Sequence, residues 1–136
     1  MVYIKYCCLF SIIIIFTGCM PYHLTEQPGV SGQTVDSETN ISLQNVTVRL
    51  EYASENIDTT DKIILTTKTS EEGTFHIAPK RKWGIYIVPT DFFPIPYSLV
   101  FIKENYITQT ITFAHSMGEK QDTVDIGTVQ LERKSN

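Results

Sequence analysis

Residues 46–52 alternate apolar and polar side chains without interruption. Successive side chains of a strand point to opposite faces, so this pattern places Val46, Val48, Leu50 and Tyr52 on one face of a half-buried strand. Other β-branched and aromatic runs predict seven further strands, at residues 29–35, 62–69, 74–78, 83–88, 97–103, 106–113 and 124–131.

Residues typical of turns separate these runs. The predicted turns are Glu71-Glu72-Gly73, Lys80-Arg81-Lys82, Pro94-Ile95-Pro96 and Glu104-Asn105. About eight short strands without an amphipathic helical window predict an all-β fold, a seven- to eight-stranded antiparallel β-sandwich or barrel.

Two positions in this pattern indicate an unusual backbone. In the last predicted strand, the apolar side chains up to Ile126 and those from Val129 onward fall on opposite faces of the alternating pattern, and the change occurs at Gly127. A β-bulge at Gly127 keeps both sets of side chains facing the core. Asn105 lies between two strands, at a turn that requires a positive φ, which Asn tolerates better than most residues.

The first residues have a different pattern. Lys5 precedes an unbroken apolar run at residues 6–16, which is typical of a secretory signal peptide. As a helix, this run spans only about 16 Å, against roughly 30 Å of hydrocarbon in a bilayer, so it is too short for a transmembrane anchor.

The run ends in Phe16-Thr17-Gly18-Cys19, which resembles the lipobox of bacterial lipoproteins, with Phe16 in place of the usual Leu. The resemblance implies a signal peptide at residues 1–18 and a diacylglyceryl thioether with an N-acyl chain on Cys19, which is sufficient for stable anchoring. Met20 in place of Asp implies the outer membrane, facing the periplasm. The alternative is that Cys19 is an ordinary residue after a conventional signal peptide.

Several short segments of the remaining chain carry a second resemblance. They are residues 30–36, 43–48, 69–75, 105–106 and 125–131, of which the T-x-x-x-G-x-F pattern ending at Phe75 is the most specific. In this order they resemble the carboxypeptidase regulatory-like domain, whose fold is a transthyretin-like sandwich. The resemblance implies a sandwich domain at residues 28–132, after a lipidated tether at residues 19–27 and before a polar tail at residues 133–136.

Charge and cysteine content narrow the possible partners. The net charge is -4, and loss of Lys5 with the signal peptide leaves about -5, which repels phosphate backbones and disfavours nucleic acid. Cys7 and Cys8 lie in the signal peptide, so Cys19 is the single thiol of the mature chain and no internal disulfide is expected.

No pattern in the sequence indicates catalysis, a metal or a cofactor. The three histidines, His23 in the tether, His76 in a strand and His115 in a loop, lack the spacing of zinc ligands. Two acidic pairs, Glu71 with Glu72 and Asp58 with Asp61, are typical of solvated turns, with weak calcium binding as the alternative. The basic triplet Lys80-Arg81-Lys82 is typical of a soluble hairpin tip, with binding of acidic lipid headgroups as the alternative.

Aromatic residues are concentrated between residues 83 and 106, and the loop at residues 89–96 is unusually apolar. One interpretation is an exposed patch that docks a partner protein or dips into the bilayer interface. The other is that Phe92 and Phe93 fold back to close the end of the sandwich. The candidate patch residues are Trp83, Tyr86, Phe92, Phe93 and Tyr97.

The sequence therefore predicts a non-catalytic lipoprotein of the cell envelope, held at a membrane by its lipid anchor. Its sandwich is expected to act as a structural or protein-binding module with an unidentified envelope partner. The alternative is a ligand-binding or inhibitor (immunity-type) periplasmic lipoprotein, which calls for a concave pocket lined by the aromatic residues.

Overall fold

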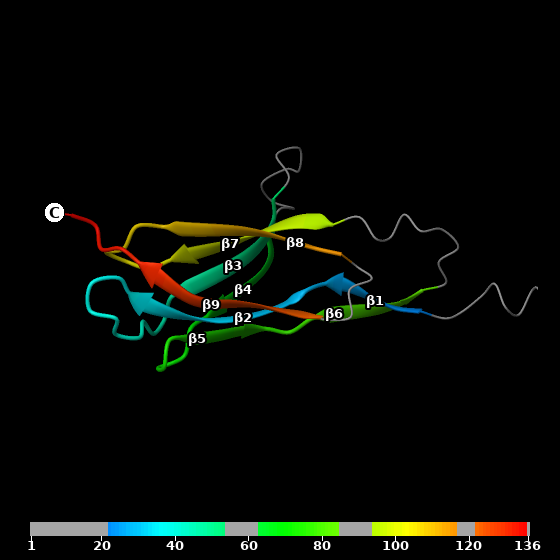
Figure 1. Cartoon of the computed structure of the whole chain (residues 1–136), viewed down its shortest axis with the longest axis horizontal. Coiled ribbons are helices and arrows are strands. Elements are labelled where there is room, and N and C mark those ends of the chain that lie inside the picture. The colour runs from blue at the N-terminus through cyan, green and yellow to red at the C-terminus, as the bar shows by residue number, and fades with distance from the viewer. Residues whose placement is uncertain (1–21, 54–62, 85–93, 117–121, 136) are drawn as a thin grey trace, which may run out of the picture.

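A computed structural model describes residues 22–53, 63–84, 94–116 and 122–135, in which nine strands and no helix occur (Figure 1). The strands form a three-stranded sheet of order β5-β2-β9, a four-stranded sheet of order β4-β3-β7-β8 and a two-stranded β1-β6 sheet. Their bounds are β1 (Tyr22–Gln27), β2 (Gly29–Asp36), β3 (Thr47–Tyr52), β4 (Ile63–Lys68), β5 (Thr74–Ile77), β6 (Lys80–Gly84), β7 (Ile95–Ile102), β8 (Gln109–His115) and β9 (Thr123–Leu131).

The two larger sheets pack as a sandwich, which confirms the predicted all-β sandwich class. Each strand pair is antiparallel except β2 with β9, which run parallel over most of their length. This parallel pair was not predicted. It joins the first and last strands of the sandwich, and parallel neighbours need a long connection, which the strands between them supply.

The core forms where the inward faces of both sheets meet. Val48 and Leu50 of β3 are fully buried, as the alternation predicts, while Arg49 between them is partly exposed. Burying an aliphatic or aromatic side chain of this size is worth roughly 1.5–3 kcal/mol, so the shared core is the main stabilising element. Its members are Val30, Leu43, Val46, Val48, Leu50, Phe75, Ile77, Tyr97, Leu99, Phe101, Tyr106, Val129 and Leu131.

Strand β7 is buried on both faces. Tyr97, Leu99 and Phe101 point into the core, and Ser98 and Val100 on the other face are also below a tenth exposed. The sequence indicates this burial, because apolar residues occur at both the odd and the even positions of this strand. The position of β7 between β3 and β8 accounts for part of that burial, because both of its edges are paired.

The special backbone positions are confirmed. Gly73 has a φ of 72°, and a Cβ added there would lie 2.6 Å from the Thr34 carbonyl oxygen, so this turn requires glycine. Asn105 has a φ of 65°. Gly127 has a φ of 73°, at the point where the β2–β9 register shifts, as expected of a bulge.

The N-terminal part of the domain differs from the prediction. Within the predicted tether at residues 19–27, residues 22–27 are strand β1, paired antiparallel with β6. The basic triplet Lys80-Arg81-Lys82 is the beginning of β6 instead of a turn, and the strand expected at residues 83–88 is described only to Gly84. Pairing with β1 explains the difference, since it satisfies backbone groups that a local sequence pattern does not register.

The boundaries of two further strands, β8 and β7, also differ. The strand predicted at residues 106–113 is β8 and begins at Gln109, because Tyr106 turns away to bridge Arg133. His115, expected in a loop, ends β8 and is 2% exposed. Ile95 and Pro96 belong to β7 instead of a turn, and Pro96 precedes Tyr97, where pairing with β3 begins, so its missing N–H leaves that ladder intact.

The sandwich is elongated, and its two ends differ (Figure 1). Strands β1 and β6 extend beyond the sandwich at one end. The C-terminus and the β2–β3 connection lie at the other end. We call the paired strands β1 and β6 the β1–β6 ribbon.

Candidate functional site

The carboxylate of Asp122, just before β9, contacts both strands of the β1–β6 ribbon, which continue in the chain into β2 and from β5. Thr25 of β1 donates its hydroxyl to Asp122 Oδ1 at 2.5 Å, and Arg81 of β6 forms an ion pair with Oδ2. Thr25 and Arg81 are cross-strand partners, so their side chains leave the ribbon on the same face. The Thr25 hydrogen bond, followed by the charge of Arg81, holds the pKa of Asp122 below its usual range.

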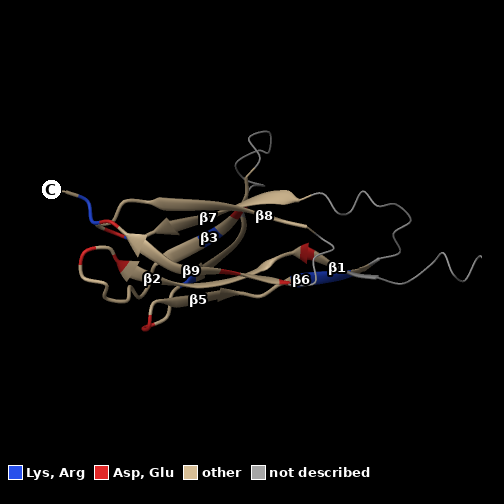
Figure 2. Cartoon of the chain, viewed as in Figure 1, with Lys and Arg blue, Asp and Glu red and all other residues tan. Residues whose placement is uncertain are grey.

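Basic residues lie in β6 of the ribbon and an acidic residue lies in β1 (Figure 2). Lys80 pairs with Glu26 at 3.1 Å, but its side chain is 66% exposed against 39% for Glu26. Arg81 likewise protrudes further than the carboxylate it contacts. Lys82 is exposed and forms no ion pair with any residue that the structure describes. The cations therefore reach solvent more freely than the acids that accompany them.

The aromatic patch predicted from the sequence is divided by the structure. Trp83 in β6 is 65% exposed, so one member of the set lies on the surface. Tyr86, Phe92 and Phe93 lie outside the described residues. Tyr97 is 1% exposed in the core, so it cannot belong to a surface patch.

Tyr97 has a packing role. Its ring stacks between those of Tyr52 and Phe113, with centroid distances of 5.6 and 5.7 Å. Burial raises the pKa of Tyr97 to about 12, so the phenol remains neutral at any physiological pH.

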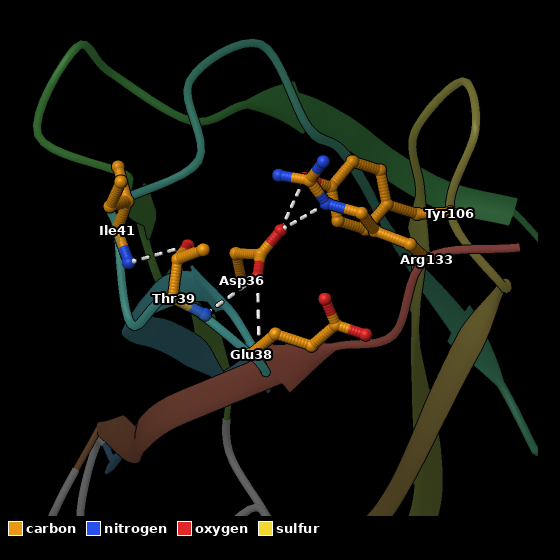
Figure 3. Close-up of polar contacts among 6 residues, drawn as sticks. All are labelled: Asp36, Glu38, Thr39, Ile41, Tyr106 and Arg133. Carbon is orange, nitrogen blue, oxygen red and sulfur yellow. Dashed lines mark hydrogen bonds and ion pairs between the residues drawn. The ribbon is translucent and has the colours of Figure 1, made fainter.

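At the opposite end of the sandwich, Asp36 is the centre of a buried polar group of residues (Figure 3). Its Oδ1 accepts hydrogen bonds from the backbone N–H groups of Glu38 and Thr39, at 3.0 and 2.9 Å. Its Oδ2 accepts from the Tyr106 hydroxyl at 2.8 Å and from Arg133 Nε at 2.7 Å. We call Asp36, Tyr106 and Arg133 the Asp36 cluster.

The hydrogen bonds of the Asp36 cluster favour the carboxylate over the acid. The Thr39 N–H, then Arg133 and Tyr106, hold the pKa of Asp36 well below its usual range, although burial opposes them. Burial together with the Asp36 carboxylate raises the pKa of Tyr106. The arrangement joins the end of β2, the β7–β8 connection and the C-terminal segment. It therefore stabilises the fold, and no carboxylate lone pair is directed to an open site.

Sequence reasoning did not identify the Asp36 cluster. The local signal was the run Asp36-Ser37-Glu38-Thr39-Asn40, in which an Asp precedes turn residues and can accept from the N–H groups two and three positions on. The contacts with Tyr106 and Arg133 cross 70 and 97 positions of the chain, and no local pattern reports them.

A shallow groove of about 400 Å³ lies between the edge strands β8 and β9. Polar uncharged residues form most of its lining, and Ile111, Val129 and Glu132 complete it. No aromatic residue lines it. This groove is therefore not the concave aromatic pocket that a ligand-binding function would require.

The remaining candidate residues lie in β5, at the end of β8 or outside the described residues. His76 is exposed on β5, while His115 is buried and its electrostatic influence reaches Asp122. No group of three His, Cys, Asp or Glu side chains gathers as a metal site within residues 22–53, 63–84, 94–116 and 122–135. None of these segments forms a helix of the length and apolarity needed to cross a bilayer. Cys19, Asp58 and Asp61 lie outside the described residues.

Comparison with known proteins defines the class of this chain through its fold. No family model and no curated protein sequence matches it. Among solved structures, a streptococcal ancillary pilin superposes with a TM-score of 0.51 at 15% identity, over 83% of this chain and 31% of the pilin. The chain thus spans about a third of the length of this pilin. The likeness shows the β-sandwich fold.

Two more distant likenesses have TM-scores too low to bear on function. The pilus 2b backbone protein of group B streptococcus superposes with a TM-score of 0.47 at 16% identity, over 80% of this chain and 42% of that one. The 5-hydroxyisourate hydrolase of Klebsiella pneumoniae superposes with a TM-score of 0.45 at 16% identity, over 79% of this chain and 99% of the enzyme.

Proposed function

We propose that this protein is a lipoprotein of the bacterial cell envelope. In this proposal acyl chains on Cys19 hold it at the outer membrane, facing the periplasm, and its sandwich is a non-catalytic structural or protein-binding module. The observation that carries the proposal is the run Phe16-Thr17-Gly18-Cys19 after an apolar segment, which resembles a lipobox. The structure adds that β1 begins at Tyr22, three residues after Cys19.

This short separation gives the anchor a structural consequence. Three residues span at most about 11 Å, so acylation of Cys19 would place the first strand of the domain close to the headgroups. A disulfide-free sandwich held this near to a bilayer has access to partners on the same membrane. It has little reach toward distant targets.

The carboxylates support the non-catalytic part of the proposal. Asp36 and Asp122, the described carboxylates with shifted pKa values, both have lowered pKa values and both accept hydrogen bonds that join separate strands. A general acid or base needs the opposite, a pKa moved toward neutrality and a lone pair facing substrate. The ancillary pilin supports a structural role only in so far as it has the same type of sandwich.

Substitution of Cys19 tests the anchor. Cys19→Ala should release the protein from its membrane or mislocalise it, and should leave a folded domain with unchanged circular dichroism. Cys8→Ala, in the predicted signal peptide, is the matched control and should leave the protein acylated and membrane-bound. Mass spectrometry of the mature N-terminus supplies the direct measurement. An unmodified N-terminus at any residue other than Cys19 would show that the protein is not a lipoprotein.

A second substitution tests the membrane assignment. Met20→Asp should retain acylation but shift the protein toward the inner membrane on a density gradient, because the lipobox resemblance assigns sorting to this position. If the wild-type protein already fractionates with the inner membrane, the outer-membrane part of the proposal fails while lipid anchoring stands.

A further inference from the structure

We infer that the β1–β6 ribbon docks end-on onto the anionic headgroups of the membrane that holds the protein, and so fixes the orientation of the sandwich. This inference rests on the proposed acylation of Cys19 and adds a second contact with the bilayer. Lys82 and Trp83 are the side chains that make this contact, with Lys80 and Arg81 behind them.

The position of the ribbon relative to Cys19 is the first argument. Trp83 is the cross-strand partner of His23, the second residue of β1, and neighbouring strands lie about 5 Å apart. Adding this spacing to the reach of the intervening residues puts the Trp83 backbone within roughly 20 Å of Cys19. The opposite end of the sandwich is separated from the ribbon by the whole length of the domain (Figure 1). The anchor therefore brings this end, and no other, to the membrane.

The residue types at this end are the second argument. Tryptophan is enriched at the membrane–water interface because its ring is apolar and its N–H is polar. Trp83 is 65% exposed, so a large aromatic area faces the solvent. Each basic side chain near an anionic leaflet contributes about 1 kcal/mol of attraction. Three consecutive residues of β6 are basic, and of these Lys80 and Arg81 are paired with Glu26 and Asp122, whereas Lys82 is not paired with a described residue.

The arrangement of the strand is the third argument. Successive residues of a strand point to opposite faces, so Lys82 and Trp83 flank the ribbon on opposite sides near its end. Arg81 shares the face of Trp83 and is directed toward Asp122. A contact along one face of the ribbon would engage only one of Lys82 and Trp83, whereas an end-on contact engages both. End-on docking is also the orientation that an anchor just before Tyr22 imposes.

Charge at the other end of the sandwich is the fourth argument. Figure 2 shows acidic residues in the connections there, among them the exposed Glu38, Glu71 and Glu72, together with the basic residues Arg133 and Lys134 of the C-terminal segment. An anionic leaflet repels these connections and attracts the ribbon. The charge distribution thus favours the same orientation as the anchor.

Trp83 is the sole tryptophan of the chain, so its fluorescence reports this contact directly. The experiment uses the acylated protein in vesicles of phosphatidylethanolamine with phosphatidylglycerol, and in vesicles of phosphatidylcholine. In the anionic vesicles we expect blue-shifted emission, quenching by lipids with brominated acyl chains and protection from acrylamide. About 1 M salt, which shortens the screening length to roughly 3 Å, should reverse these effects.

A charge-reversal pair supplies the matched control. Lys82→Glu should lower the ratio of docked to undocked protein by roughly fivefold or more, from the contribution of one basic side chain. Lys134→Glu makes the same change in charge at the opposite end, at an exposed residue of the C-terminal segment, and should leave the ratio unchanged.

The outcomes separate this inference from the proposed function. If the acylated protein resides in the vesicles but Trp83 stays open to acrylamide and unquenched by brominated lipid, the ribbon does not dock, while the lipoprotein proposal stands. If Trp83 is protected in native envelopes and not in pure lipid, its partner is a protein and the inference is wrong. If the purified protein carries no acyl chains, both fail together.

Discussion

The two ends of the sandwich use carboxylates for different purposes. At one end Asp36 is almost completely buried and accepts four hydrogen bonds, two of which join segments distant in sequence. At the other end Asp122 is partly exposed and holds a two-stranded ribbon through Thr25 and Arg81. The first end is part of the cooperative core, whereas the second is attached to it at its base. Stability should therefore depend on the Asp36 cluster, and the proposed membrane contact on the ribbon.

This difference follows from how much structure each carboxylate supports. Tyr106 packs in the hydrophobic core and its hydroxyl reaches Asp36, so loss of that contact disturbs the core itself. The ribbon has only two strands, which are marginally stable alone in water. Contacts with Asp122 therefore control local order, and their loss need not unfold the sandwich.

Asp36→Ala should produce the largest effect. It removes the acceptor of four hydrogen bonds and leaves the Tyr106 hydroxyl and two backbone N–H groups without it. We expect the melting temperature to fall by roughly 10 °C or more. Glu38→Ala is the control, because the exposed Glu38 contributes its backbone N–H and not its side chain to the cluster. Equal melting temperatures for the two variants would mean that the cluster does not hold this end together.

Acid should act on the same end. The pKa of Asp36 is lowered in the folded state, so the unfolded chain binds the proton more tightly and folding is favoured wherever Asp36 is ionised. This contribution is complete above the usual value of 3.8 and is lost as the pH falls below it toward the folded-state pKa. Denaturation in urea between about pH 6 and pH 2 measures the loss. Asp36→Asn should flatten the curve, and a curve as steep as that of the wild type would contradict this assignment.

Tyr106→Phe should produce an intermediate effect, because it removes the hydroxyl donor and retains the buried ring. A hydrogen bond to a charged group contributes about 1.5–3 kcal/mol, which is the expected fall in the free energy of unfolding. A double-mutant cycle with Asp36→Asn isolates the pair. Additive effects of the two substitutions would show that Tyr106 and Asp36 are not coupled.

How far the sequence predicts this molecule depends on the sequence separation of the contacts. The alternation at residues 46–52, the turn at Gly73, the positive φ of Asn105 and the bulge at Gly127 are local patterns, and each was predicted. Strand β1 was not predicted, because its partner β6 lies more than fifty residues away and residues 22–27 have no clear period.

The residues of the candidate site could likewise be predicted only where their contacts are local in sequence. Trp83 and the basic triplet were noticed as residue types, but only the pairing of β6 with β1 brings them beside the segment that follows Cys19. Tyr97 was assigned to a surface patch from its neighbours in sequence, whereas its position in the central strand β7 makes it a core residue. Composition thus identified the residues, and long-range pairing decided which of them are exposed.

Arg81→Ala should have the smallest effect on global stability and the clearest effect on the ribbon. The side chain is 57% exposed, and an ion pair of this kind contributes about 0–1 kcal/mol, so the urea midpoint should change little. Amide hydrogen exchange should accelerate in β1 and β6, which Arg81 ties to Asp122, while β2 and β3 keep their protection. Lys80→Ala is the matched control, since its pairing with Glu26 is internal to the ribbon. Uniform acceleration across all strands would mean that the ribbon and the sandwich unfold as one unit, and that the two ends do not differ in stability.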